Sequence, residues 1–107
     1  MRHIDKGFDK YSLQVGDVYI LQGNAKIYVT MNRGVTLSLY SYNYHAASFD
    51  FGTGELWICD TALLQSVTTT RHVYKFIGMV DYEHSISRVV YNGPKKLNVL
   101  SHMPNNA

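Results

Sequence analysis

The sequence predicts one mostly β domain, either a small antiparallel barrel or a compact sandwich of about seven short strands, with one short helix near residues 60–66. Two observations support this fold class. Apolar and polar residues alternate with the period of a strand in several short runs, and pairs of turn-forming residues separate these runs. The chain has 107 residues, of which 46% are hydrophobic, and this length suits a single core.

The two ends of the chain differ from the part between them. Residues 1–12 are polar and mixed in charge, which predicts a loose N-terminal lead-in, and residues 103–107 have the composition of a frayed tail. The part between them has no internal repeat and no linker-like segment. We therefore expect a single domain over residues 1–107.

The first expected strands join at a tight turn. One strand runs from Val18 to Leu21, and the pair Gly23 and Asn24 follows it. Both residues tolerate a positive φ, so the pair predicts a hairpin. The next run places apolar residues on one face and polar residues on the other (Ala25, Ile27, Val29 and Met31 against Lys26, Tyr28 and Thr30). Such alternation predicts that one face of the sheet contacts water.

A stripe of tyrosines is expected on the next strand. After a turn at residues 32–34, Tyr40, Tyr42 and Tyr44 recur at period two, which predicts that they project from one face of one strand. A short alternating run at 48–51 and a glycine loop at 52–54 follow. The apolar run 55–59 predicts a buried strand that contains the single cysteine, Cys59.

The second half of the chain predicts the helix and the last strands. Asp60 and Thr61 are suitable caps for the short helix near 60–66. The β-branched run 67–70 and the run 73–80 predict strands. A final hairpin is expected from strands at 86–91 and 94–100, because Asn92 and Gly93 are a strong turn signal.

One resemblance accompanies this assignment. The run from Leu13 to Leu21, together with a short helix before a late strand, resembles the SH3-like barrels. The resemblance implies a barrel fold and does not imply a function.

Composition excludes several functional classes. The net charge of +2 is too small for the clustered basic surface that binds duplex nucleic acid. Cys59 alone cannot form an internal disulfide, which suits a reducing compartment. The N-terminal residues do not resemble a signal peptide, and no apolar run is long enough to span a membrane. We therefore expect a cytoplasmic protein, of a cell or of an infected host.

No catalytic or metal-binding motif is present. The five histidines lack the short spacing of zinc ligands, so we expect no metal and no cofactor. Because no catalytic motif is found, we do not expect an enzyme. A histidine-dependent nuclease is the alternative, with His45 and His72 as acid and base and with Arg71 and Lys75 nearby.

The tyrosine stripe is therefore the candidate site. It combines aromatic residues with cations from other segments (Tyr40, Tyr42, Tyr44 and Phe49 with Arg33, Arg71 and Lys75). We expect a non-catalytic protein that binds a protein partner, or a second copy of itself, through a tyrosine-rich surface. Its size and lack of motifs resemble accessory proteins of bacteriophages, which inhibit or sequester a host factor. The alternative is capture of a nucleotide, including a nucleotide signal, or of single-stranded nucleic acid by stacking on the aromatic rings.

Overall fold

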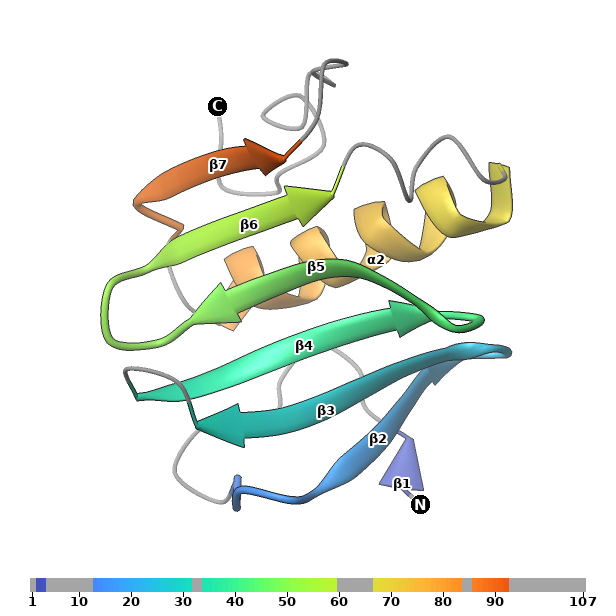
Figure 1. Ribbon diagram of the computed structural model, residues 1–107, viewed down its shortest axis with the longest axis horizontal. Coiled ribbons are helices and arrows are strands. Elements are labelled where there is room, and N and C mark those ends of the chain that lie inside the picture. Colours follow the sequence, from blue (N-terminus) through green and yellow to red (C-terminus); the bar gives the residue numbers. More distant parts are fainter. Residues whose placement is uncertain (1, 4–12, 32–33, 60–66, 84–85, 93–107) are drawn as a thin grey trace.

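The chain folds into one sheet and one helix in the computed structural model, which describes residues 2–3, 13–31, 34–59, 67–83 and 86–92. The seven strands stand in the sheet in sequence order (Figure 1). These strands are β1 (Arg2–His3), β2 (Val18–Gln22), β3 (Ala25–Met31), β4 (Val35–Ser41), β5 (Tyr44–Asp50), β6 (Glu55–Cys59) and β7 (Arg88–Asn92), and the helix is α2 (Val67–Glu83).

The sheet is antiparallel in its middle and parallel at its two ends. Strands β2 to β6 pair antiparallel with their sequence neighbours. Strand β1 pairs parallel with β2, and β7 pairs parallel with β6. Two parallel neighbours need a long crossover, and α2 lies in that connection between β6 and β7.

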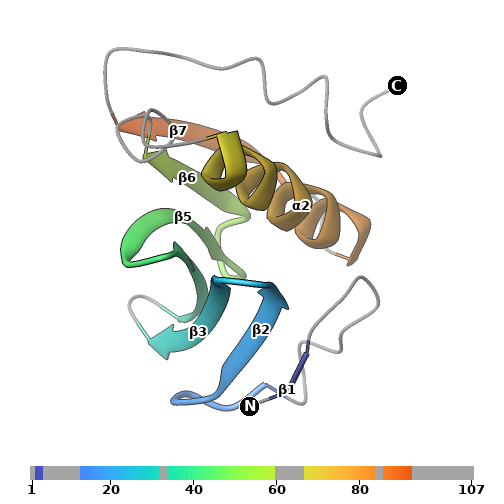
Figure 2. The ribbon, with the colours of Figure 1, turned by 90° about the vertical axis from the view of Figure 1, so that its right-hand side faces the viewer.

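The mostly β fold class is confirmed, but the expected barrel or sandwich is wrong. The strand order is linear, with β1 at one end and β7 at the other, so the described strands form a single open sheet. Figure 2 shows this sheet bending around α2. The helix covers one face of the sheet, which a second sheet or barrel closure would otherwise have to cover.

The core lies between the sheet and α2. In β3, Ile27 and Val29 are fully buried, whereas Lys26, Tyr28 and Thr30 on the opposite face are partly exposed. The alternation expected for this strand is therefore confirmed. The buried apolar residues on the core face of the sheet include Ala25, Ile27, Val29, Leu37, Leu39, Phe49, Leu56 and Ile58.

The strands expected at 67–70 and 73–80 are wrong, because these residues belong to α2. The buried residues of this segment recur at spacings of three and four, which is the period of a helix with one face packed on a sheet (Thr69, Val73, Phe76, Ile77 and Val80). No helix among the described residues is long and apolar enough to cross a membrane.

Other expectations fall partly or wholly outside the described residues. The helix near 60–66, the strand at 94–100 and the tail at 103–107 all lie there. Within the expected loose lead-in, Arg2 and His3 form β1 and pair with Tyr19 and Ile20 of β2. This short part of the lead-in is therefore strand.

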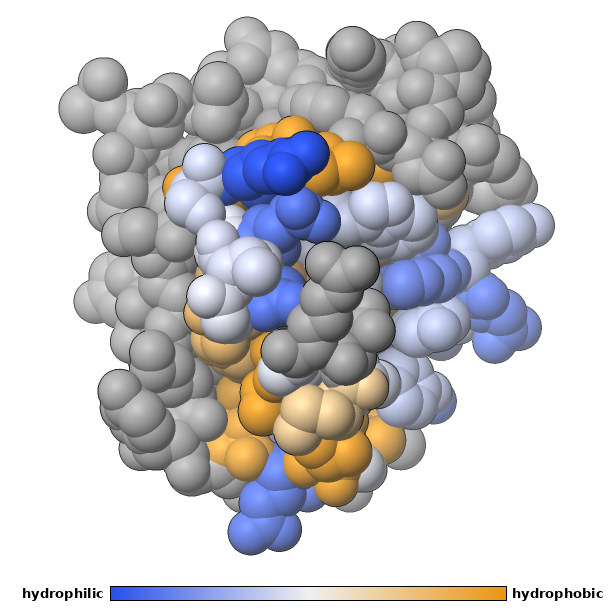
Figure 3. Space-filling model, turned by 60° about the vertical axis from the view of Figure 1, so that its left-hand side comes forward, coloured by the Kyte–Doolittle hydropathy of each residue, from blue (hydrophilic) through white to orange (hydrophobic). Residues whose placement is uncertain are grey.

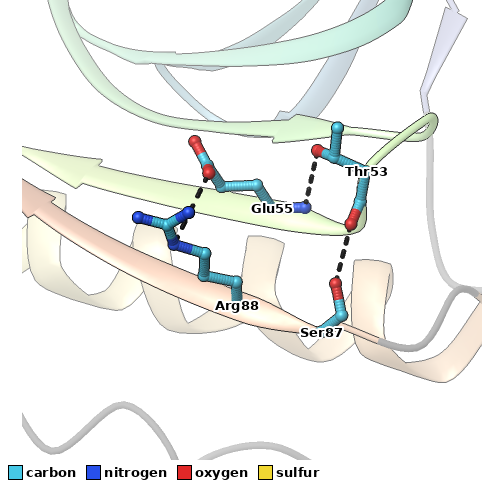
Figure 4. A network of polar contacts seen from close by, with 4 residues as sticks. All are labelled: Thr53, Glu55, Ser87 and Arg88. Atoms are coloured by element: carbon cyan, nitrogen blue, oxygen red, sulfur yellow. Dashed lines mark hydrogen bonds and ion pairs between the residues drawn. The ribbon is translucent and has the colours of Figure 1, made fainter.

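Polar contacts fix the start of β7 to the loop between β5 and β6 (Figure 4). The Ser87 hydroxyl donates to the Thr53 carbonyl oxygen at 2.7 Å, and the Ser87 amide donates to the Gly54 carbonyl oxygen at 2.9 Å. Arg88 Nε lies 3.8 Å from Glu55 Oε2. The two Ser87 bonds attach the start of β7 to the loop, and the ion pair joins the first residues of β6 and β7.

Candidate functional site

The face of the sheet opposite α2, here called the polar face, carries aligned side chains from neighbouring strands. Strand register places Tyr40 beside Lys26 and His45 in one row. A second row contains Tyr28, Ser38, Ser48 and Trp57, and a third contains Thr30, Thr36 and Asp50. Because register sets these neighbours, residues distant in sequence share one surface.

A hollow of about 350 Å³ opens on this face. This polar hollow is lined by hydroxyl groups, two carboxylates, an imidazole and one indole ring (Thr30, Thr36, Ser38, His45, Ser48, Asp50, Glu55 and Trp57). Thr36 and Ser38 form part of its wall although they are only 7% and 8% exposed. The size is that of a small-molecule site, and its lining is unusually polar for one.

Hydrogen bonds join the side chains of the polar hollow across three strands. His45 Nε2 lies 2.6 Å from Ser48 Oγ, and Ser48 Oγ lies 3.4 Å from Ser38 Oγ. Ser38 Oγ lies 3.5 Å from the hydroxyl of Thr30, which also contacts the Thr36 carbonyl oxygen at 3.4 Å. The shortest of these hydrogen bonds is the one between the His45 imidazole and the Ser48 hydroxyl.

Four aromatic side chains form a row across β3 to β6. Tyr28 packs edge-on against Tyr40, with ring centroids 5.2 Å apart. His45 lies between the rings of Tyr40 and Trp57, with both centroid distances at 4.8 Å. This aromatic row fixes the plane of the His45 ring from both sides.

A β-bulge explains why His45 reaches the polar face. Leu39 pairs with Ala47 and Tyr40 pairs with His45, so Ala46 is an extra residue in β5. Ala46 and Ala47 are both buried, and His45 is turned to the side opposite them. Burial lowers the pKa of His45, and a hydrogen bond with the backbone of Ala47 acts in the opposite direction.

A second hollow, of about 440 Å³, lies beside the aromatic row. This tyrosine groove is lined by Tyr28, Thr30, Tyr40, Tyr42 and Asn43. Tyr42 has a φ of 59°, in the left-handed region, and its side chain is 50% exposed. The Tyr42 ring also lies 6.3 Å from the ring of His72 in α2. The groove therefore reaches the end of the sheet where the β4–β5 turn meets the helix.

Hydrophobic and hydrophilic residues are unevenly distributed over the surface of the molecule. Figure 3 shows a hydrophobic patch in the lower middle of the view, with hydrophilic residues above it, beside it and below it. Val15 and Met31 are among the exposed large apolar side chains, at 55% and 60% exposure.

The expected stripe of three tyrosines on one strand is wrong. Strand β4 ends at Ser41, Tyr42 and Asn43 form a turn, and Tyr44 begins β5. Tyr40 and Tyr42 still meet in the tyrosine groove, and Tyr44 is 48% exposed.

Of the other predicted site residues that the structure describes, none is brought to the polar face. Phe49 is buried in the core at 1% exposure. Arg71 and Lys75 are exposed on α2, on the other side of the sheet, and Arg33 lies outside the described residues. Cys59 is half-buried and packs beside the core.

His45 and His72 lie on opposite faces of the sheet and do not converge. His72 is 4% exposed, and its Nδ1 lies 2.8 Å from Ser41 Oγ, which contacts the Thr69 hydroxyl at 3.0 Å. These three residues hold α2 against the core face. Within the described parts of the chain, no three histidine, cysteine or acidic side chains are grouped to hold a metal ion.

Sequence reasoning missed the residues that build the polar hollow. Ser38, Ser48 and Trp57 belong to different strands, and only strand register brings them together. Alternation in β3, on the strand that follows it and in the run at 48–51 pointed to a polar face there. It did not show that four strands would contribute to one cavity.

One comparison with known proteins gives a match. The model of a family described as a family of unknown function (DUF8033) matches residues 2–93, which is most of the chain. No curated protein and no solved structure matches the chain.

Proposed function

We propose that this chain, which belongs to the DUF8033 family, is a binding protein that recognises a protein partner through the tyrosine groove. The proposal extends to the kind of partner, a cytoplasmic factor of a host cell that binding inhibits or sequesters. This extension is based on the small size of the chain and its lack of motifs.

The backbone of Tyr42 is the observation that carries the proposal. A φ of 59° is costly for a bulky side chain, by about 1–2 kcal/mol, and glycine or asparagine usually occupies such a position. Backbone strain of this kind is concentrated at functional sites. Here the strained conformation holds a half-exposed aromatic ring at the edge of a groove.

The residues around Tyr42 also support a protein partner. Tyrosine is enriched in protein interfaces and at their energetic centres, because it combines a rigid apolar ring with a polar group. Tyr28, Tyr40 and Tyr42 supply three such rings in one groove, and Tyr44 lies at the start of the next strand. A partner that covers this surface would bury aromatic area at little cost in side-chain entropy.

The test uses a photo-crosslinking residue at position 42 of the full chain, expressed in host cells. We expect one defined protein adduct from position 42 and none from the same residue placed at Val67, which is 70% exposed on α2. With the partner purified, Tyr42→Asn is expected to weaken binding by about 2 kcal/mol or more, the loss typical of a central interface residue.

Stability measurements separate a binding defect from a folding defect. Asparagine tolerates a positive φ better than tyrosine, so Tyr42→Asn should leave the free energy of unfolding unchanged or slightly higher. Equal crosslinking from positions 42 and 67, or unchanged affinity of the Tyr42→Asn variant, would contradict the proposal.

A nucleotide ligand is the second candidate, and the position of His72 favours it. The ring of Tyr42 is near His72, and the positive charge of Lys75 acts on His72 from the same helix. A base could stack on Tyr42 at the end of the sheet, outside the polar face, with its phosphates toward the exposed Arg71 and Lys75 of α2. Quenching of tyrosine fluorescence by nucleotides, weakened by added salt, is the outcome that would favour this candidate over a protein partner.

A further inference from the structure

The polar hollow contains a serine and a histidine in the arrangement of a nucleophile and its base. We propose that Ser48 is a nucleophile activated by His45, and that the polar hollow takes a small uncharged or positively charged ester, whose acyl group is transferred to Ser48 and then to water. This activity goes beyond the proposed binding function, and it departs from the expectation that the chain is not an enzyme.

The first argument is the distance between nucleophile and base. His45 Nε2 lies 2.6 Å from Ser48 Oγ, within the range that proton transfer requires. The other contact of Ser48 Oγ, with Ser38 Oγ, is longer at 3.4 Å. The Ser48 hydroxyl donates to Ser38 Oγ at this longer distance, so it becomes a nucleophile when its proton turns to the nearer His45 Nε2.

The second argument is the orientation and charge of the base. The rings of Tyr40 and Trp57 hold the imidazole plane from both sides. A hydrogen bond to the backbone of Ala47 that favours the protonated ring is one that the ring donates. The proposed reaction uses the tautomer of His45 that carries its proton on Nδ1, because Nε2 is then the acceptor for the Ser48 proton. Burial keeps the pKa of His45 below its ordinary value, so the ring is neutral at neutral pH and can accept a proton.

The third argument comes from a second Ser–His pair in the same molecule. Ser41 Oγ lies 2.8 Å from His72 Nδ1, but Ser41 is fully buried and His72 is 4% exposed. That pair lies in the core, where a substrate cannot reach it. Ser48 and His45 are half-buried and line a hollow of about 350 Å³. Accessibility therefore distinguishes the Ser48–His45 pair from a purely structural one.

The lining of the polar hollow sets the class of substrate. Asp50 and Glu55 both line it, and the only cation paired with either carboxylate among the described residues is Arg88, at 3.8 Å from Glu55. Two carboxylates repel a phosphodiester or a carboxylate ligand. An uncharged or cationic ester meets no such repulsion, and the hydroxyls of Thr30 and Ser38 can bind its polar groups.

The reaction has two balanced steps. Ser48 Oγ bonds to the ester carbonyl carbon and its proton moves to His45 Nε2. The bond to the leaving alcohol then breaks, and the alcohol takes this proton. Water next attacks the acyl carbon and gives a proton to His45, after which the acyl bond to Ser48 Oγ breaks and Oγ recovers the proton.

The test is covalent labelling of the full chain with a neutral alkyl fluorophosphonate, which releases fluoride as it bonds to an activated serine. We expect peptide mapping to find the adduct on Ser48 ahead of Ser38, Ser41 and Ser87. His45→Phe keeps a flat ring between Tyr40 and Trp57 but has no base, so labelling should slow by about 100-fold or more. Ser87→Ala, outside the hollow, is the matched control and should label like the wild type.

Two outcomes would overturn the inference. One is wild-type protein without an adduct on Ser48, and this mapping decides the question even if the His45→Phe variant does not fold. The other is equal labelling of folded His45→Phe and wild type. For the substrate class, wild type but not Ser48→Ala should hydrolyse 4-nitrophenyl acetate, whereas hydrolysis of bis(4-nitrophenyl) phosphate would contradict the assigned class. Labelling needs no protein partner, so its result is independent of the crosslinking at position 42.

Discussion

At the scale of single residues, the turn at Tyr42 shows why the tyrosine stripe was misplaced. Tyr40, Tyr42 and Tyr44 recur at period two in the sequence, but Tyr40 pairs with His45 and Tyr44 pairs with Ser41, so the two-residue turn places Tyr40 and Tyr44 on opposite faces of the sheet. The usual signal for such a turn is a pair of residues that tolerate a positive φ. Here the tyrosine, and not Asn43, takes the positive φ, so the local sequence predicts continued strand.

The spacing of His45 and Ser48 hid the polar hollow in a similar way. Residues three apart in a regular strand point to opposite faces. The bulge at Ala46 shifts the alternation by one residue and brings both side chains to the polar face. A bulge of this kind has no strong sequence signature, so the pair could not be predicted from spacing.

His72 leads to a prediction about the pH dependence of stability. Burial, and then the charge of Lys75, lower its pKa from the ordinary value of 6.5. The unfolded chain therefore binds this proton more readily than the folded protein does. The contribution to stability is complete above about pH 6.5 and is lost as the pH falls through the lower, folded value. Urea unfolding should show lower stability at about pH 5.5 than at about pH 7.5.

His45 shifts in the same direction and adds to this dependence. The control variant is His72→Gln, which retains a hydrogen-bonding side chain beside Ser41 but does not titrate. Its stability should change less between the two pH values than that of the wild type. An equal change in both proteins would show that the buried imidazole is not a source of the effect.

At the scale of elements, α2 forms although the first residues of its sequence favour a strand. The run Val67–Thr70 is β-branched, which favours strand. The longer segment nevertheless places its large apolar residues, Val73, Phe76, Ile77 and Val80, on one face of a helix. Packing of that face on the sheet outweighs the weak intrinsic preference of the first turn.

Truncation of Phe76 tests whether this packed face holds the helix. The side chain is fully buried against the sheet, so Phe76→Ala should lower the free energy of unfolding by about 3–5 kcal/mol. Thr68→Ala changes an exposed position of the same helix and should stay within about 0.5 kcal/mol of wild type. Urea unfolding followed by circular dichroism gives both values, and similar costs for the two variants would mean that α2 is not docked as described.

At the scale of the whole molecule, the turn signals predicted neighbouring strands but not how the sheet ends. The hairpins β2–β3 and β5–β6 follow from local turn residues at 23–24 and 52–54. The open edge and the parallel pairing of β6 with β7 depend on where α2 crosses, and that contact is distant in sequence. A series of hairpins is expected to close into a barrel, because closure leaves no exposed strand edge. Residues 67–80 were predicted as strands, so the sequence did not indicate that a helix would cover one face of an open sheet.

One face of the sheet packs on α2, and the other face is open to ligands. Each face carries one Ser–His pair, so replacing each serine tests whether the two faces differ in packing. Ser41→Ala leaves the buried Nδ1 of His72 without its partner, which should cost about 1–3 kcal/mol. Ser48→Ala also removes a hydroxyl bonded to a histidine, but it does so beside a hollow that water can enter. Its cost should be about 0.5 kcal/mol or less by urea unfolding. Equal costs would mean that the polar face is as tightly packed as the core, whereas the expected difference would mean that Ser48 is not required for the fold.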